Sequence, residues 1–528
     1  MNDKPKSKLR WRLLRWGLIG LAVIATLAAI LVTEENWRGK RAWENYKRAA
    51  EARGERFEWA AFAPTNVPDD QNFFCAPIVA EALKWHGNGH TDASEAHVAD
   101  AVNRMTFDIY RGESELWPKH GGNWQKGELA DLKEWQTYFQ MFNATPEGRT
   151  NGFPAAARPQ SPAADVLVAL SDFNPALEEL RQASLRPDAR MPLNYENGFD
   201  DVGTLLPWLA QEKRCAQFLQ LRILAELQAN QGAEALADVK LPLRLTDAIR
   251  NQPFLISHLV RIAIQAIALQ PVYEGLAQHR WNDAQLADLE AVLAAKDYLA
   301  DFQFSMRGER TCAIYFFETQ RRTREMKSDT EVAGGNVITT NSLRFMPSAF
   351  FYQNELAVAR MYEQFILPLV DLTNRTVSVA AYRTGEADIK KQIKHYSPYT
   401  VQALMVFPAV GSKTVVMKWA LIQTQVDLAR VACALERFHL AHGNYPETLD
   451  ALAPQFIATL PHDLINGQPL HYRRTDDPPS PGSGAASGKF VLYSVGWDEK
   501  DDGGKIFFTK AGSVDREKGD WVWQYPAK

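Results

Sequence analysis

The chain has 528 residues, of which 46% are apolar, 11% aromatic and 23% charged, a composition typical of folded globular proteins and unlike that of disordered ones. Its formal net charge is −4, although residues 1–15 carry six Lys or Arg side chains and one Asp. Since the sequence indicates no basic surface beyond this short segment, nucleic acid is not expected as a partner, and the length predicts several domains.

The first predicted element is a transmembrane helix at residues 16–33. This segment, WGLIGLAVIATLAAILVT, has 18 residues without a charge, close to the roughly 20 that cross the hydrocarbon core of a bilayer. Arg12 and Arg15 precede it, so the positive-inside rule places the basic tail, residues 1–15, in the cytoplasm. We therefore expect a single-pass anchor in a bacterial inner membrane, with the bulk of the chain periplasmic. A cleaved signal peptide is the alternative.

Helical patterns dominate the residues that follow. A charged amphipathic helix is predicted over 35–56, ending near Gly54. It opens a juxtamembrane and mixed helical region that we expect to extend over 34–200. Helical periodicity returns at 163–183, where Pro175 predicts a break within the run.

Residues 201–404 are predicted to form an α-helical domain. Within it, Asn282 and Gln285 have the spacing of a capping box at a helix start. The apolar run 254–270 contains a histidine and an arginine, so we expect a buried core helix there and not a second membrane span.

Residues 405–528 are predicted to form a small α+β domain. A long helix over 414–442 precedes a short helix, and an antiparallel sheet follows, with strand-like runs at 469–473, 489–494 and 506–508. The predicted fold class is therefore mainly α: one transmembrane helix, a large helical domain and a small C-terminal α+β domain.

Three sequence blocks in this last region carry a resemblance to a known family. They are ALERFHLAHGNYPETLDAL (434–452), LPHDLINGQPLHYRR (460–474) and FVLYSVGWDEKDDGG (490–504). In this order they resemble the globular domain of type II secretion pseudopilins, especially the major one, over about residues 410–510. The same residues have a physical interpretation, because Gly443 lets the chain leave the helix and Asp463 shapes a turn before the first strand.

The resemblance implies a calcium site, because the corresponding aspartate loop of the major pseudopilins binds calcium. Ser494 and Asp498 match the Ser and Asp of the family motif, and Asp501 and Asp502 lie where further acidic ligands would be supplied. Calcium requires about six to eight oxygen ligands on a bendable loop, and two glycines close this one. A solvated acidic turn is the alternative interpretation.

The chain also departs from the family pattern. The predicted membrane helix lies far upstream of the pseudopilin-like region and lacks a Phe-Thr-x-x-Glu processing sequence, so we do not expect processing as a pilin subunit. The remainder is similar in general form to large membrane-anchored proteins of planctomycete and verrucomicrobial lineages. We expect a non-catalytic envelope protein that presents a pseudopilin-like head to envelope or secretion-system proteins, with a link to a type II secretion or type IV pilus-like system.

An envelope hydrolase with a site in the helical domain is the alternative function. The sequence has no HExxH, Gly-x-Ser-x-Gly, phosphate-loop or dinucleotide motif, so no catalytic residue is assigned. The other side chains considered as site candidates are better explained by their structural roles. We expect His258 with Arg261 to be hydrogen-bonded in the core and His439 with His442 to lie at a helix C-terminus. We expect Trp117, Trp124 and Trp135 to pack in the core. The cysteines fit no metal-binding spacing and are expected as free thiols, although a disulfide is permitted outside the cytoplasm; they are Cys75, Cys215, Cys312 and Cys433.

Overall fold

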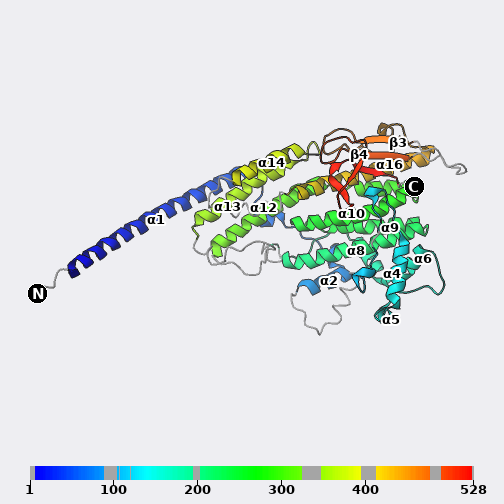
Figure 1. The fold of residues 1–528 in the computed structure, drawn as a ribbon, viewed down its shortest axis with the longest axis horizontal. Helices are drawn as coiled ribbons and strands as arrows, with labels where there is room; N and C mark the ends of the chain where they lie inside the picture. The colour runs from blue at the N-terminus through cyan, green and yellow to red at the C-terminus, as the bar shows by residue number, and fades with distance from the viewer. Residues whose placement is uncertain are drawn as a thin grey trace.

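The computed structural model describes residues 6–87, 104–105, 107–118, 121–193, 195, 202–323, 346–393, 412–475 and 489–525. The expected domain boundaries near 200 and 404 lie outside these residues. Most of the described chain is helical, and small antiparallel sheets lie near its C-terminal end (Figure 1). The mainly-α fold class predicted from the sequence is confirmed.

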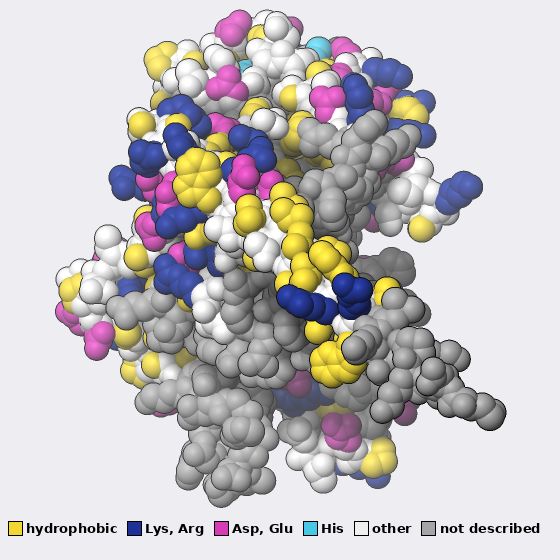
Figure 2. All heavy atoms as spheres, turned by 90° about the vertical axis from the view of Figure 1, so that its left-hand side faces the viewer, with side chains coloured by type: hydrophobic (Ala, Val, Ile, Leu, Met, Phe, Trp, Pro, Cys, Tyr) yellow, Lys and Arg dark blue, Asp and Glu magenta, His cyan; other side chains and the backbone are white. Residues whose placement is uncertain are grey.

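A single long helix forms the N-terminal part of the described chain. Helix α1 (Lys6–Glu51) has 46 residues, about 69 Å at 1.5 Å per residue, and its first half protrudes from the body (Figure 1). Its apolar window is not buried at all. Viewed from that end, hydrophobic side chains follow the protruding helix and basic ones gather near its tip (Figure 2). This pattern suggests a transmembrane or signal anchor.

The second half of α1 is docked on the body. It packs along α13 (Ser348–Met361), and the two backbones approach closely where Gly39 meets Ala349. Asn36 Oδ1 accepts from the backbone N–H of Ala349 at 2.7 Å, and Tyr46 donates to Glu363 at 2.7 Å. The predicted end near Gly54 is confirmed, but the amphipathic segment is not a separate helix, because it continues the anchor helix without a break.

The helical body is formed by antiparallel neighbours joined by short connections. Its central helices are α8 (Val202–Gln228), α9 (Gly232–Ala248), α10 (Leu255–Ala277), α11 (Asp283–Ala294) and α12 (Tyr298–Thr323). The surrounding helices are α2 (Pro77–Gly87), α4 (Leu132–Ala144), α5 (Gly148–Asn151), α6 (Pro162–Ala169), α7 (Asn174–Ser184) and α14 (Val379–Ile393). The predicted capping box at Asn282 and the helix break beside Pro175 are both confirmed.

Helix α10 is a core helix, as its polar residues predicted. It is long and apolar enough to span a membrane, but 67% of its apolar window is buried within the body. His258 contacts the carbonyl of Gln252 at 2.9 Å, and Arg261 Nε donates to the carbonyl of Thr246 at 2.7 Å. Arg261 also forms an ion pair with Asp301. Partners of this kind offset the cost of burying polar groups inside a core.

The C-terminal module, residues 412–475 and 489–525, comprises one long helix and two small sheets. Helix α16 (Lys413–His442) precedes the antiparallel sheet β3-β4-β7, and strands β5 and β6 form a separate pair. The strands are β3 (His471–Thr475), β4 (Lys489–Ser494), β5 (Ile506–Phe508), β6 (Val514–Gly519) and β7 (Trp521–Gln524). Sequence patterns predicted α16, β3, β4 and β5 but missed β6 and β7. They also missed the hairpin of β1 (Val370–Asp371) and β2 (Thr376–Val377).

The contact between α1 and α13 generates a prediction. A Cβ at Gly39 would lie 3.3 Å from the Cα of Ala349, whereas a Cβ at Gly20 would meet nothing within 4 Å. We expect Gly39→Leu to lower the free energy of unfolding by about 2 kcal/mol through overpacking, measured by denaturation of the detergent-solubilised chain. The matched control Gly20→Leu is expected to leave the midpoint unchanged, and equal midpoints for the two variants would contradict this packing.

Candidate functional site

The pseudopilin-like blocks meet at the C-terminal end of α16. The helix ends at Gly443, whose φ of +74° is the left-handed conformation that glycine adopts without strain. Two residues later, Tyr445 folds back against the helix, where it is buried and donates to Glu436 Oε2 at 2.8 Å. The turn expected from the first sequence block therefore joins α16 to the sheet through a buried aromatic ring.

Asp463 connects the second sequence block to the third. Its side chain is fully buried, and its carboxylate accepts from Ser494 Oγ at 2.9 Å and from the backbone N–H groups of Val495 and Ile465, each at 2.9 Å. The N–H of Gly467 donates to the carbonyl of Asp463 at 2.8 Å. The turn that the sequence predicted at Asp463 is confirmed, and the same carboxylate also fixes the start of the loop after β4.

The acidic loop, residues 494–504, is folded by hydrogen bonds to its own carboxylates. Asp498 accepts from the backbone N–H groups of Lys500 and Gly519, both at 3.3 Å. Asp501 Oδ1 accepts from Gly503 N–H at 2.9 Å and from the Tyr493 hydroxyl at 3.0 Å. The Gly503 N–H lowers the pKa of Asp501 by stabilising its charged form. The carboxylates of Asp498 and Asp501 therefore help to hold the loop in its conformation.

A buried carboxylate that the sequence analysis missed closes the loop. Asp520, between β6 and β7, is 3% exposed and accepts backbone N–H groups from Asp502 at 3.3 Å, Gly504 at 2.6 Å and Lys505 at 3.2 Å. Its burial raises the pKa of its carboxyl group. In the sequence, a Gly-Asp pair stands directly before an aromatic strand, a pattern that favours a tight turn at this position.

The four residues of the expected calcium site do not converge on one point in this structure. Ser494 is buried and directs its hydroxyl to Asp463, whereas Asp498 and Asp501 accept from backbone groups at different places in the loop. Asp502 is exposed. Within the described part of the chain, the group of three His, Cys, Asp or Glu side chains whose ligand atoms lie within 4.8 Å of one another is His279, Glu436 and His439. Calcium binding by the loop stays a prediction.

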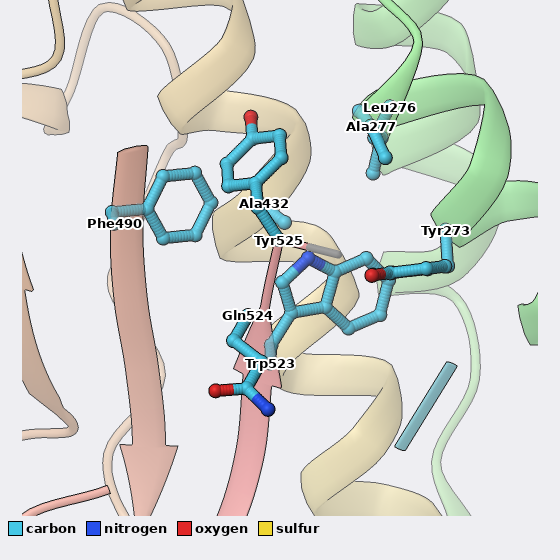
Figure 3. A pocket seen from close by; sticks show the side chains of 8 residues that line it. All are labelled: Tyr273, Leu276, Ala277, Ala432, Phe490, Trp523, Gln524 and Tyr525. Atoms are coloured by element: carbon cyan, nitrogen blue, oxygen red, sulfur yellow. The ribbon is translucent and has the colours of Figure 1, made fainter. Parts of the chain in front are cut away.

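The module is attached to the helical body along a seam of aromatic rings. Trp523 on β7 packs against Trp124 with ring centroids 5.0 Å apart and against Tyr273 of α10 at 5.6 Å. Figure 3 shows the side chains that meet beside these rings between α10, α16 and β7, where they leave no room for a ligand. The Tyr525 ring lies at this seam next to Phe490, whose ring centroid is 5.1 Å away.

Polar contacts extend the attachment around the module. The N–H of Val377 in β2 donates to the carbonyl of Leu464 at 2.8 Å. Arg383 on α14 pairs with Glu499 of the acidic loop at 2.6 Å. Within the module itself, Lys413 at the start of α16 pairs with Glu517 on β6 at 2.5 Å. The module is therefore held against the body from more than one side.

The other side chains that the sequence analysis considered are packed or hydrogen-bonded within the protein. Trp124 and Trp135 are buried, and Trp117 is 36% exposed and contacts Tyr110. His442 is exposed and contacts the carbonyl of Phe438. The four cysteines are free thiols, as expected, and three of them are buried.

In comparisons with protein-family models, with curated proteins and with solved structures, nothing matches this chain. The pseudopilin resemblance therefore rests on the three sequence blocks.

The buried carboxylate of Asp463 leads to a second prediction. Asp463→Ala leaves the Ser494 hydroxyl and two buried backbone N–H groups without an acceptor, so we expect a loss of about 3 kcal/mol in the free energy of unfolding. Asp502→Ala removes an exposed carboxylate of the same loop and should change it by less than about 0.5 kcal/mol. Urea denaturation of the full chain followed by tryptophan fluorescence measures both, and a small effect at Asp463 would contradict its bridging role.

Proposed function

We propose that this protein is a non-catalytic, membrane-anchored envelope protein that presents its pseudopilin-like C-terminal module for protein–protein interaction. One observation carries the proposal: α1 is continuous from its exposed apolar half to its docked half, and the module lies at the opposite end of the molecule from the tip of α1 (Figure 1). A helix docked along half of its length holds the body at a defined distance from the membrane, and the module faces away from it.

The proposed topology follows from charge. Basic residues precede the apolar segment, so the N-terminal tail is cytoplasmic and the body periplasmic in an inner membrane. The proposed partners are envelope or secretion-system proteins of a type II secretion or type IV pilus-like system. The resemblance of residues 410–510 supports this class of partner, and the net acidity of the chain beyond residue 15 makes nucleic acid an unsuitable one.

The exposed part of the module presents an aromatic side chain and acidic side chains next to each other. Phe508 on β5 is 56% exposed, and the acidic loop beside β5 exposes Asp501 and Asp502. An exposed aromatic ring bordered by charged groups is typical of the residues that dominate binding energy in protein interfaces.

Co-purification from native membranes tests this function. We expect secretion or pilus-like components to be recovered with the solubilised full-length chain, and Phe508→Ala to reduce their recovery at least several-fold. Leu185→Ala is the matched control, because Leu185 is 74% exposed but lies after α7, outside the module. Recovery of the same proteins at the same level with Phe508→Ala, or no such components with the unmodified chain, would overturn the proposal.

Calcium binding by the acidic loop is a separate part of the proposal. Binding would bring the carboxylates of Asp498 and Asp501 onto one ion in the folded loop, so we expect Ca²⁺ to raise the melting temperature of the EDTA-treated chain and Asp498→Ala to abolish that rise. Glu447→Ala, an exposed carboxylate of the same module outside the loop, serves as the control. A melting temperature that does not respond to millimolar Ca²⁺ would end the calcium claim.

A further inference from the structure

Three side chains with metal-ligand chemistry meet where the end of α10 lies beside α16. Glu436 and His439 are three residues apart on α16, a spacing that places both on one face of a helix. His279 follows the end of α10, and its Nδ1 lies 2.5 Å from Glu436 Oε1. One ligand atom from each residue lies within 4.8 Å of those of the other two. We name these three residues the His279 cluster.

The backbone at His279 is held in an unusual conformation. Its φ is +53°, and the N–H groups of His279 and Arg280 donate to the carbonyls of Leu276 and Gly275 at 3.1 and 2.9 Å. This is the Schellman ending of a helix, in which glycine usually occupies the left-handed position. A residue with a side chain costs roughly 1–2 kcal/mol there. An imidazole at this position, directed at a buried carboxylate, indicates an interaction that compensates for the strain.

Aromatic stacking fixes the orientation of the second histidine. The His439 ring lies between the rings of His279 and Tyr445, with centroid distances of 5.5 and 4.7 Å and interplanar angles of 23° and 25°. Its Nδ1 is buried and has no hydrogen-bond partner among the described residues. A buried ring nitrogen without a partner is costly unless a ligand satisfies it.

The carboxylate is positioned in the same way. Glu436 is 1% exposed, and the Tyr445 hydroxyl donates to its Oε2 at 2.8 Å while Oε1 faces His279. Tyr445 in turn contacts the Tyr525 hydroxyl. A hydrogen bond to one carboxylate oxygen that directs the other oxygen toward a second ligand is the arrangement by which outer-shell groups orient metal ligands.

We propose that the His279 cluster binds a divalent transition-metal ion, with Zn²⁺ as the best fit. Two imidazoles and one carboxylate are a donor set that suits zinc, whereas calcium and magnesium prefer oxygen donors alone. Ligand bonds of about 2.0–2.2 Å place the donor atoms of a tetrahedral site roughly 3.3–3.6 Å apart. Small side-chain rotations therefore bring the cluster to coordination distance, and the ion takes the place of the proton shared by His279 and Glu436.

The location of the cluster gives the ion a structural role. The side chain of His279 is 49% exposed, so an ion enters from solvent and retains a position for water. Binding joins the end of α10 to α16 and, through Glu436 and Tyr445, to the seam where the module meets the body. The site is distinct from the acidic loop and does not depend on the proposed interaction partners.

Zinc titration of the full-length chain tests the proposal. The detergent-solubilised protein, stripped with EDTA and dialysed, is titrated with ZnCl₂ by calorimetry, and its melting temperature is measured with and without Zn²⁺. We expect one ion per chain and a higher melting temperature. Co²⁺ in place of Zn²⁺ should give the visible absorption of a tetrahedral site, a readout independent of stability.

Two variants and a matched control decide the assignment. His279→Asn removes the imidazole but keeps a residue that tolerates positive φ, and it should weaken Zn²⁺ binding at least tenfold. Glu436→Gln retains an acceptor for Tyr445 and should do the same, which guards against a folding defect in the first variant. His442→Asn, an exposed histidine one turn further along α16, should bind like the unmodified chain. No binding by the unmodified chain, unchanged binding in both variants, or an equal loss in His442→Asn would overturn the proposal.

Discussion

The burial of α16 on all sides is the constraint on which the rest of the structure depends. Between Val415 and Glu436, every side chain except Lys418 and Arg430 is buried. Helices α10, α11 and α12 cover part of its surface, and strands β4 and β7 cover another part. A helix that is enclosed in this way belongs to two cores at once, so the helical body and the C-terminal module share one continuous cluster of buried apolar side chains.

The polar residues of α16 show how its position is fixed. Gln423 Oε1 accepts from the N–H of Tyr298, the first residue of α12, at 2.7 Å. Arg430 pairs with Glu290 of α11 at 3.0 Å. Glu436 accepts from the Tyr445 hydroxyl and contacts His279 Nδ1. Apolar packing alone tolerates rotation and sliding of a helix, whereas a buried polar group must meet its partner. These contacts therefore set the register of α16 against each neighbouring element.

The enclosure of α16 bears on the pseudopilin resemblance. In the family pattern, the membrane helix continues into the globular domain. Here the helix suited to a membrane is α1, and the helix of the module is α16, whose remaining surface is covered by α10, α11 and α12. Between Val415 and Glu436, α16 therefore has no face left for a further partner. This arrangement supports the proposal of a presented module, in agreement with the missing processing sequence.

The features predicted from sequence are those encoded by neighbouring residues. The helix end at Gly443, the capping box at Asn282 and the break at Pro175 depend on local backbone chemistry, so local patterns indicated them. Strand β6 was missed because its sequence, VDREKG, has no apolar alternation. Strand β7, WVWQ, also lacks alternation, because three successive side chains are buried. His279 was missed for a different reason, since its partner Glu436 lies far away in the sequence and only the tertiary structure shows the contact. For Asp520, the Gly-Asp pair indicates a turn, but only the tertiary structure shows which loop N–H groups its carboxylate accepts.

The shared helix α16 also couples the stability of the module to that of the body. Without the body, the module would expose Trp419, whose ring packs against Phe302 of α12 with centroids 5.6 Å apart, and burial of a large apolar side chain contributes roughly 1.5–3 kcal/mol. The module and the body are therefore expected to unfold together. Any ligand that binds only the folded state stabilises both by the same free energy. An ion at the seam would thus strengthen the attachment of the module without touching the acidic loop, whereas an ion in the loop would stiffen the surface that faces a partner.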